Sequence, residues 1–214
     1  MRDRLSGRLR TRGVYWSAVL VGILLVCTLG LANARENPQS DDAADQPGRG
    51  HVARIRHPYQ VPDITLRDRH DRPVKLRSLL DGSQPVVLQF IFTSCQTVCP
   101  MLTSMMAQAQ DSLRDVDPST RLVSISLDPD YDTPSRMAKY ADKFGARGDW
   151  RFLTGDWKDI RRTLNAFDAM YPGENKMNHK PLTFMRAAGA DQWVRLTGTM
   201  SAGTLLAQYR KTLN

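Results

Sequence analysis

The sequence predicts an α/β domain in which helices cover a mixed central sheet. Strand-like and helix-like segments alternate from residue 61 to the end of the chain, which is typical of α/β proteins. A nearly continuous apolar run at 85–92 is expected of a strand buried on both faces of a parallel sheet. Two further strand-like segments, separated by the short turn 188–191, predict a hairpin and therefore antiparallel pairing in the same sheet.

Each predicted element has a local signal. Segments 63–66 and 74–76 flank a turn and predict a first hairpin. After the 85–92 strand, apolar residues recur at spacings of three and four from Leu102 to Leu113 and predict a helix. The remaining predicted elements are, in order, a strand at 121–127, a helix capped by Thr133 with Pro134 at its first position, a strand at 150–153, a helix at 156–169, strands at 182–185 and 193–196, and a helix opened by Ser201.

The charge of the chain is unevenly distributed. Its 214 residues include 30 Lys and Arg and 22 Asp and Glu, for a net charge of +8. Residues 1–13 contain five arginines and one aspartate, so half of this excess lies in the first 13 residues. The mild excess on the remainder is a weak argument for a phosphate-binding surface, and no glycine-rich nucleotide motif is present. Nucleic acid is therefore not a predicted partner.

An uncharged apolar segment, Val14 to Ala32, follows these arginines. As an α-helix, its 19 residues would be about as long as the hydrocarbon core of a membrane is thick, roughly 30 Å. Flanking arginines stay in the cytoplasm, so the rest of the chain is expected outside. Ala32-Asn33-Ala34 also fits the cleavage site of a signal peptide. The segment is therefore either an uncleaved anchor or a cleaved signal, and the anchor is preferred. The predicted units are an anchor or signal at 1–34, a flexible linker at 35–60 that lacks apolar periodicity, and a domain at 61–214.

The chemistry-bearing motif is Cys95-Gln96-Thr97-Val98-Cys99-Pro100. It follows the buried strand and is expected to open the next helix, with the two sulfurs one helical turn apart. A helix N-terminus lowers thiol pKa and favours the thiolate, which is both the nucleophile of disulfide exchange and a soft ligand for Cu(I). The pair is therefore suited to metal binding, to redox exchange, or to both.

A structural disulfide is the remaining interpretation, and the little entropy gained by closing a five-residue ring argues against it. A stable single-metal site needs a third ligand, for which histidine is the natural type. Spacing does not choose among the four histidines. His51 and His57 in the linker and His70 at the hairpin tip are expected to be exposed, and only His179 falls in the second half of the predicted domain.

The chain resembles the Sco/SenC family of membrane-tethered, thioredoxin-like copper proteins. The resemblance covers about residues 60–214 together with the N-terminal anchor. It is carried by three segments: Phe92–Pro100 with the two cysteines, Ser124–Pro134 with the run Asp128-Pro129-Asp130, and the pair Asn178-His179.

The resemblance implies a thioredoxin-like sandwich whose metal ligands are Cys95, Cys99 and His179, binding one Cu(I) or Cu(II) per domain. It also places an acidic residue, Asp128, beside the site, whereas from the residues alone Asp128 is equally well a turn cap. The implied function is delivery of copper to the binuclear copper site of cytochrome c oxidase. The implied partners are the oxidase subunit that holds this site and a second copper chaperone or a thiol reductant. The implied location is a bacterial inner membrane, with the N-terminus cytoplasmic and the domain periplasmic.

The second hypothesis is an enzyme, a thiol–disulfide oxidoreductase in which Cys95 and Cys99 cycle through a disulfide. The usual C-x-x-C spacing of such enzymes is absent, which favours the copper chaperone. The local sequence pattern of thiol peroxidases is absent from this chain, which argues against that class. A structural zinc site is also disfavoured, because two cysteines and one histidine leave it without a fourth ligand.

Overall fold

Eight strands form one mixed sheet within residues 52–173 and 175–214, the part of the chain that the computed structural model describes. They are β1 (Ala53–His57), β2 (Thr65–Asp68), β3 (Pro73–Lys75), β4 (Val86–Ile91), β5 (Arg121–Ser126), β6 (Arg151–Thr154), β7 (Leu182–Arg186) and β8 (Trp193–Thr197). Their order across the sheet is β1-β8-β7-β4-β5-β6-β2-β3. Strands β4, β5 and β6 are parallel to one another, and every other pairing is antiparallel.

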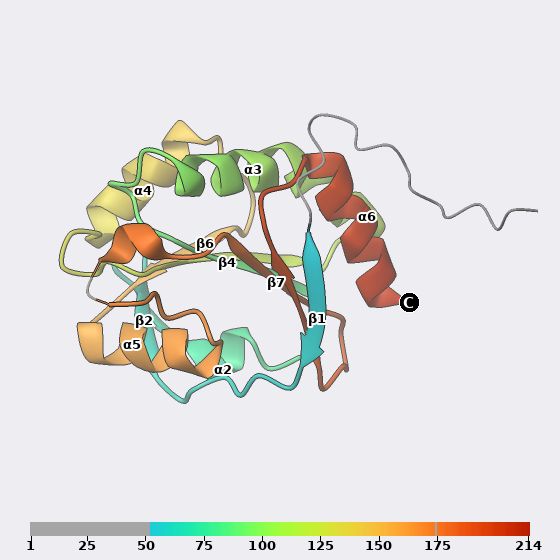
Figure 1. The fold of residues 1–214 in the computed structure, drawn as a ribbon, viewed down its shortest axis with the longest axis horizontal. Coiled ribbons are helices and arrows are strands. Elements are labelled where there is room, and N and C mark those ends of the chain that lie inside the picture. Colours follow the sequence, from blue (N-terminus) through green and yellow to red (C-terminus); the bar gives the residue numbers. More distant parts are fainter. Residues whose placement is uncertain (1–51, 174) are drawn as a thin grey trace, which may run out of the picture. The chain divides into compact units, whose positions relative to one another are not determined.

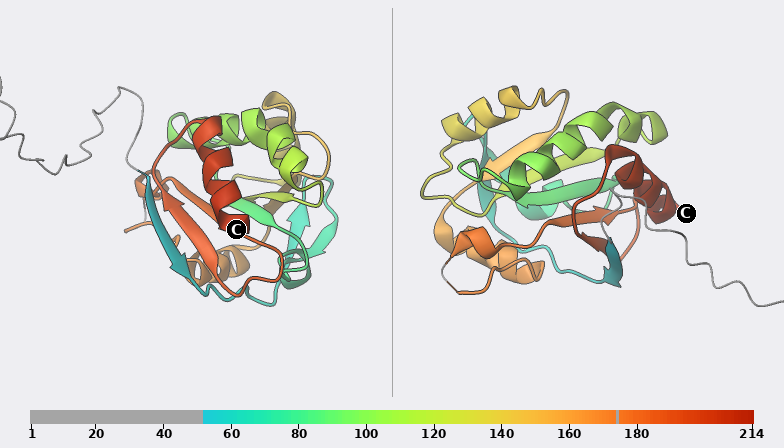
Figure 2. Two further views of the ribbon diagram at one scale, coloured as in Figure 1. Left: turned by 90° about the vertical axis from the view of Figure 1, so that its right-hand side faces the viewer. Right: turned by 45° about the horizontal axis from the view of Figure 1, so that its top comes forward.

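Helices cover both faces of this sheet. They are α2 (Leu76–Leu79), α3 (Val98–Val116), α4 (Pro134–Lys143), α5 (Trp157–Ala166), the 3-10 helix η1 (Lys176–Asn178) and α6 (Ala202–Leu213). Helices α3, α4 and α6 lie on one face, and α2 and α5 lie on the other (Figure 1). Helices α3 and α6 pack side by side, as Figure 2 shows. The predicted sandwich with a mixed sheet is confirmed.

The local signals account for most of these elements. All six residues of β4 are buried between the two helical layers, as its apolar run predicts. Both predicted hairpins form, as β2–β3 and β7–β8. Thr133 and Ser201 cap α4 and α6 by accepting hydrogen bonds from backbone N–H groups in the first turn of each helix. The helix predicted at 156–169 ends earlier, at Ala166.

The predicted linker extends too far into the domain. Residues 53–57 form β1, which pairs with β8 from Ala53↔Thr197 to His57↔Trp193. Tyr59 is buried and packs on the ring of Phe167, with 5.5 Å between ring centroids. Strand β1 lies at the edge of the sheet and is mostly exposed, and its alternation Ala53-Arg54-Ile55-Arg56 is too short to distinguish a strand from a linker in sequence.

The predicted anchor or signal (1–34) and the linker up to His51 lie outside the described residues. Among the helices that are described, none combines the length and the apolar character needed to cross a membrane.

A buried carboxylate joins the ends of the two central parallel strands. Asp132 is fully buried just before α4, and it accepts hydrogen bonds from the Thr93 N–H at 3.1 Å, from the Thr93 hydroxyl at 2.5 Å and from the Ser126 hydroxyl at 2.6 Å. Thr93 follows β4 and Ser126 ends β5. Burial raises the pKa of Asp132, and the hydrogen bonds from Ser126 and Thr93 oppose that rise. Asp132 thus fixes the start of the cysteine loop.

We expect Asp132→Ala to lower the free energy of unfolding by about 3 kcal/mol, because it leaves the buried donors of Thr93 and Ser126 without an acceptor. Urea unfolding of the reduced protein measures this loss. The matched control is Asp130→Ala, at an exposed carboxylate of the same turn, for which the change should stay within about 0.5 kcal/mol. Equal effects of the two substitutions would contradict the role given to Asp132.

Candidate metal centre

The two cysteines lie on either side of the beginning of α3. The helix starts at Val98, so Cys99 is in its first turn and Cys95 precedes it in a turn where the Cys95 N–H donates to the Phe92 carbonyl at 3.2 Å. The prediction that both cysteines lie on the helix is therefore wrong for Cys95. The side chain of Thr97 makes no capping bond. Instead, the first-turn N–H of Cys99 donates to Cys95 Sγ at 3.5 Å, which meets the need of a helix start for an acceptor.

The two thiols differ in acidity. Burial by itself would raise the pKa of Cys95, but the N–H groups of Cys99 and Thr97 and the Thr97 hydroxyl together bring it below its ordinary value. Burial raises the pKa of Cys99 far above its ordinary value, and the nearby Cys95 and Asp132 raise it further. The sequence-based expectation of a lowered pKa thus holds for Cys95 and is wrong for Cys99. Both cysteines are free thiols.

His179 lies against Cys99, although 80 residues separate them. Its Nε2 is 3.4 Å from Cys99 Sγ, and its ring packs edge-on to Phe92 with 5.2 Å between centroids. The His179 Nδ1 is 3.0 Å from the carbonyl oxygen of Lys176. A carbonyl only accepts, so Nδ1 carries the proton and Nε2 presents its lone pair to Cys99 Sγ. Burial lowers the pKa of His179, which keeps the imidazole neutral near pH 7.

This geometry suits a soft metal ion at Cys99 and His179. A donor sulfur and a donor nitrogen bonded to one metal at about 2.3 and 2.0 Å lie roughly 3.5–3.7 Å apart at ordinary bond angles, close to the observed 3.4 Å. An Nδ1–H fixed by a carbonyl is the usual support of a ligating histidine. Within the described ranges, no three His, Cys, Asp or Glu side chains are already arranged as a metal site. The structure thus brings Cys99 to His179 and to the Cys95 loop without closing a three-ligand set.

Asp128 lies near the site, as the resemblance implies, and its side chain does not cap the turn. Its carboxylate forms an ion pair with Lys176, the residue whose carbonyl holds His179. Its backbone carbonyl, not its side chain, accepts the turn bonds from Tyr131 and Asp132. The acid whose charge raises the pKa of Cys99 is Asp132, not Asp128.

Sequence reasoning missed Asp132 and Lys176 as supports of the site. Asp132 lies within the Ser124–Pro134 segment and is followed by a helix cap, a position that favours a structural interpretation. Lys176 acts through its backbone carbonyl, for which side-chain identity gives no signal.

Comparison with known proteins identifies the fold and the family. The sequence model of the SCO1/SenC family matches residues 54–214. The chain belongs to the SCO1/SenC family. The matched range begins within β1, which agrees with the structural boundary of the domain rather than with the predicted one.

Individual SCO1/SenC relatives are similar over much of the domain. The SCO1 protein homolog of Bacillus subtilis is 35% identical over 128 residues, which are 57% of this chain and 65% of that protein. The chain thus covers just under two thirds of that relative. The structure of BsSco, described as a member of the Sco family of cytochrome c oxidase assembly proteins with a disulfide switch, is 24% identical with a TM-score of 0.60 and covers 72% of this chain and 94% of that one. Arabidopsis thaliana ScoI, crystallised with copper bound, is 20% identical with a TM-score of 0.59, at 72% and 97% coverage. These structures establish the thioredoxin-like fold.

We expect iodoacetamide to modify Cys95 about tenfold faster than Cys99 in the reduced, metal-free protein near neutral pH, because only Cys95 has a lowered pKa and Cys99 has no exposed surface. Peptide mass spectrometry over time resolves the two cysteines. Thr97→Val removes the hydroxyl 3.8 Å from Cys95 Sγ and should slow the modification of Cys95 while leaving Cys99 unaffected. Equal rates at the two cysteines would contradict the assigned acidities.

Proposed function

We propose that this chain binds copper through Cys95, Cys99 and His179 and delivers it to the binuclear copper site of cytochrome c oxidase during assembly of that enzyme. The observation that carries the proposal is the contact of His179 Nε2 with Cys99 Sγ, with Nδ1 held by the Lys176 carbonyl. Two soft sulfurs and a neutral imidazole form a donor set suited to copper in either oxidation state. Membership of the SCO1/SenC family and the copper-bound state of the Arabidopsis relative support it.

Cys95 is the ligand that joins Cys99 and His179 to complete the proposed site. Cys99 and His179 are already in contact, whereas Cys95 lies in the turn before α3, where no helical hydrogen-bond ladder holds its backbone. Its thiol is also the more acidic of the two, so it is the first to offer a thiolate. Copper is thus captured at Cys95 and then enclosed by Cys99 and His179.

Release to a partner is favoured by the exposed apolar residues on both sides of the site. Met101 follows Cys99 in α3 and is 55% exposed, and Met177 precedes His179 in η1 and is 51% exposed. Methionine is common at protein-binding surfaces because its flexible, polarizable side chain adapts to a partner. We assign this contact to the oxidase subunit that receives the copper.

The proposed location follows from the N-terminal sequence. Arginines 2, 4, 8, 10 and 12 precede the uncharged segment Val14–Ala32. By the positive-inside rule, this segment anchors the chain in a bacterial inner membrane with the domain in the periplasm.

The difference between the two thiols favours a second candidate function, disulfide exchange with a partner protein. An acidic, slightly exposed Cys95 is suited to attack a partner disulfide, and Cys99 is placed to attack the resulting mixed disulfide. In that reaction the partner gains two electrons and two protons, and Cys95 and Cys99 form a disulfide that a thiol reductant must reduce again. The disulfide switch described for BsSco is compatible with it.

We expect Cys95→Ala and Cys99→Ala each to abolish tight copper binding, and His179→Ala to weaken mainly the Cu(II) form. Two thiolates suffice for Cu(I), whereas Cu(II) needs additional nitrogen ligands. Competition titrations of the reduced protein with chelators of each ion measure both affinities. His70→Ala, at an exposed turn, is the matched control and should leave both unchanged. Undiminished Cu(II) affinity of His179→Ala would remove His179 from the site.

We expect a Cys95–Cys99 disulfide to prevent copper loading, because the disulfide has no thiolate to offer. Oxidised and reduced samples are titrated under the same conditions, with the Cu(I) arm free of oxygen. The affinity of the oxidised protein should be at least about a hundredfold lower. Equal stoichiometry and affinity in both samples would place the copper ligands elsewhere in the chain.

A further inference from the structure

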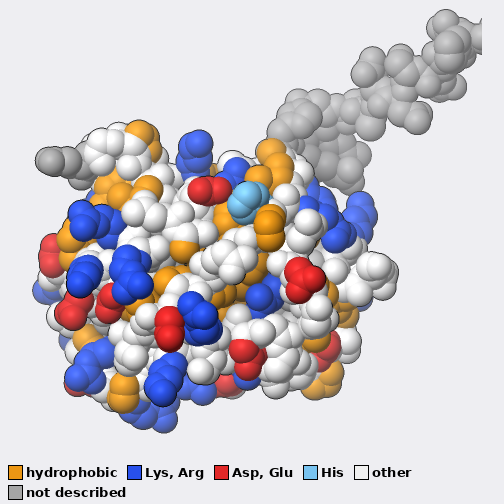
Figure 3. All heavy atoms as spheres, turned by 90° about the horizontal axis from the view of Figure 1, so that it is seen from below, with side chains coloured by type: hydrophobic (Ala, Val, Ile, Leu, Met, Phe, Trp, Pro, Cys, Tyr) orange, Lys and Arg blue, Asp and Glu red, His pale blue; other side chains and the backbone are white. Residues whose placement is uncertain are grey.

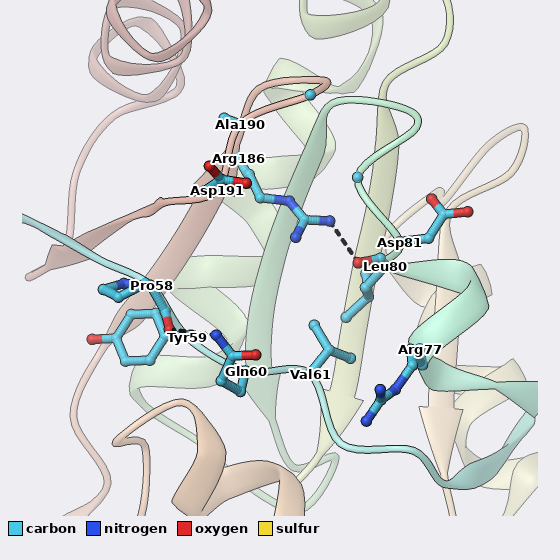
Figure 4. A pocket seen from close by; sticks show the side chains of 12 residues that line it. Pro58, Tyr59, Gln60, Val61, Arg77, Leu80, Asp81, Arg186, Ala190 and Asp191 are labelled. Carbon is cyan, nitrogen blue, oxygen red and sulfur yellow. Dashed lines mark hydrogen bonds between the residues drawn. The ribbon is translucent and has the colours of Figure 1, made fainter.

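A second candidate site lies at the opposite end of the central strands. The metal centre follows the C-terminal end of β4, whereas this hollow, of about 470 Å³, lies beside the loop that precedes β4 and the end of β7. Its walls come from the segment after β1, from α2 and the loop after it, and from the β7–β8 turn; Figure 4 shows these side chains. A hollow of this size is in the range of small-molecule sites.

Arg186, the last residue of β7, extends its guanidinium into this hollow (Figure 4). Only 8% of the residue is exposed, and the guanidinium carbon lies 4.5 Å from the ring centroid of Trp193. Its Nη2 donates to the Leu80 carbonyl at 2.5 Å, the one hydrogen bond that the five N–H donors of this guanidinium make to other described residues. Its Nε is buried without a partner. The third nitrogen, Nη1, makes no hydrogen bond to a described residue either, but it is exposed to solvent.

Arg186 has no counter-ion in the described part of the chain. Asp81, one of the two aspartates that line the hollow, forms an ion pair with Arg121 at 3.9 Å and accepts hydrogen bonds from Ser83. In Figure 4 its carboxylate points away from Arg186. Burial lowers the pKa of Arg186, and the charge of Asp81, which acts on it without forming an ion pair, partly opposes that shift. A buried cation with unused donors beside an open hollow is the arrangement expected of an anion site.

The surroundings of Arg186 select the kind of anion. Of the apolar residues that line the hollow, Val61 is half-buried, whereas Tyr59 and Leu80 are almost completely buried. The face seen in Figure 3 shows hydrophobic side chains among separate basic and acidic ones. Two arginines, Arg77 and Arg186, and two aspartates, Asp81 and Asp191, line the hollow, so its lining has no net charge, although no ion pair joins Arg186 to either aspartate. A multiply charged anion therefore gains little long-range attraction, whereas a single carboxylate with an apolar body matches both the guanidinium and the walls.

We propose that this hollow binds a small aliphatic monocarboxylate, whose carboxylate pairs with the Arg186 guanidinium and whose hydrocarbon part lies against Val61. Because the site is at the far end of the strands from Cys99 and His179, it is independent of copper loading.

Butyrate is the probe, and saturation-transfer NMR on its methyl protons, with the reduced full-length chain, is the measurement. Butyrate should bind saturably to the wild type, and Arg186→Gln should weaken binding at least about tenfold by removing a charge-assisted hydrogen bond. Arg56→Gln, at an exposed arginine of β1, is the matched control and should bind as the wild type does.

A second variant keeps the test decisive if Arg186→Gln does not fold, which circular dichroism reports. Val61→Trp fills the hollow and leaves Arg186 in place, so it should also abolish saturation. Absence of saturable binding to the wild type, or unchanged binding to a folded Val61→Trp, would overturn the proposal. Inorganic phosphate displacing butyrate at equal concentration would overturn the assignment to a monocarboxylate.

Discussion

The carboxylate of Asp132 is the interaction on which the site depends. It ties the backbone after β4 to the end of β5, where the Leu127 N–H donates to the Ile91 carbonyl at 2.8 Å. The chain therefore leaves β4 in a fixed direction, and the Phe92 N–H reaches Cys99 Sγ at 3.4 Å. Burying a carboxylate is costly, and three donated hydrogen bonds offset that cost. The same charge opposes ionisation of Cys99, so the group that positions the loop also separates the acidities of the two thiols.

Local hydrogen bonds in the loop before β7 hold the histidine. The Asn175 side chain caps η1, the Lys176 carbonyl fixes the imidazole, and the Lys176 side chain is tied to Asp128 after β5. The loop before β7 is thus attached to the loop after β5. Ring orientation and tautomer are set before any metal arrives, so binding does not bear the entropy cost of ordering His179.

Much of the fold could be predicted because periodicity and capping residues are local. The six buried residues of β4, the two hairpins and the caps of α4 and α6 all have such signals. Strand β1 has only the brief alternation Ala53-Arg54-Ile55-Arg56, since an exposed edge strand needs no long apolar face. The cysteine pair was visible from spacing, but the choice of His179 rested on a family resemblance, because a contact across 80 residues leaves no trace in spacing. The high pKa of Cys99 follows from burial, which the helix-dipole argument ignores.

The edge position of β1 has a consequence for solubility. Among the described residues the sheet has two edge strands, β1 and β3, and each has backbone groups that no further described strand pairs. Strand β1 carries Arg54 and Arg56, and β3 carries Pro73 and Lys75. Stacking of two copies would bring like charges together at either border, and Pro73 has no N–H to donate. Both borders thus resist intermolecular strand pairing and the amyloid-like growth that follows from it.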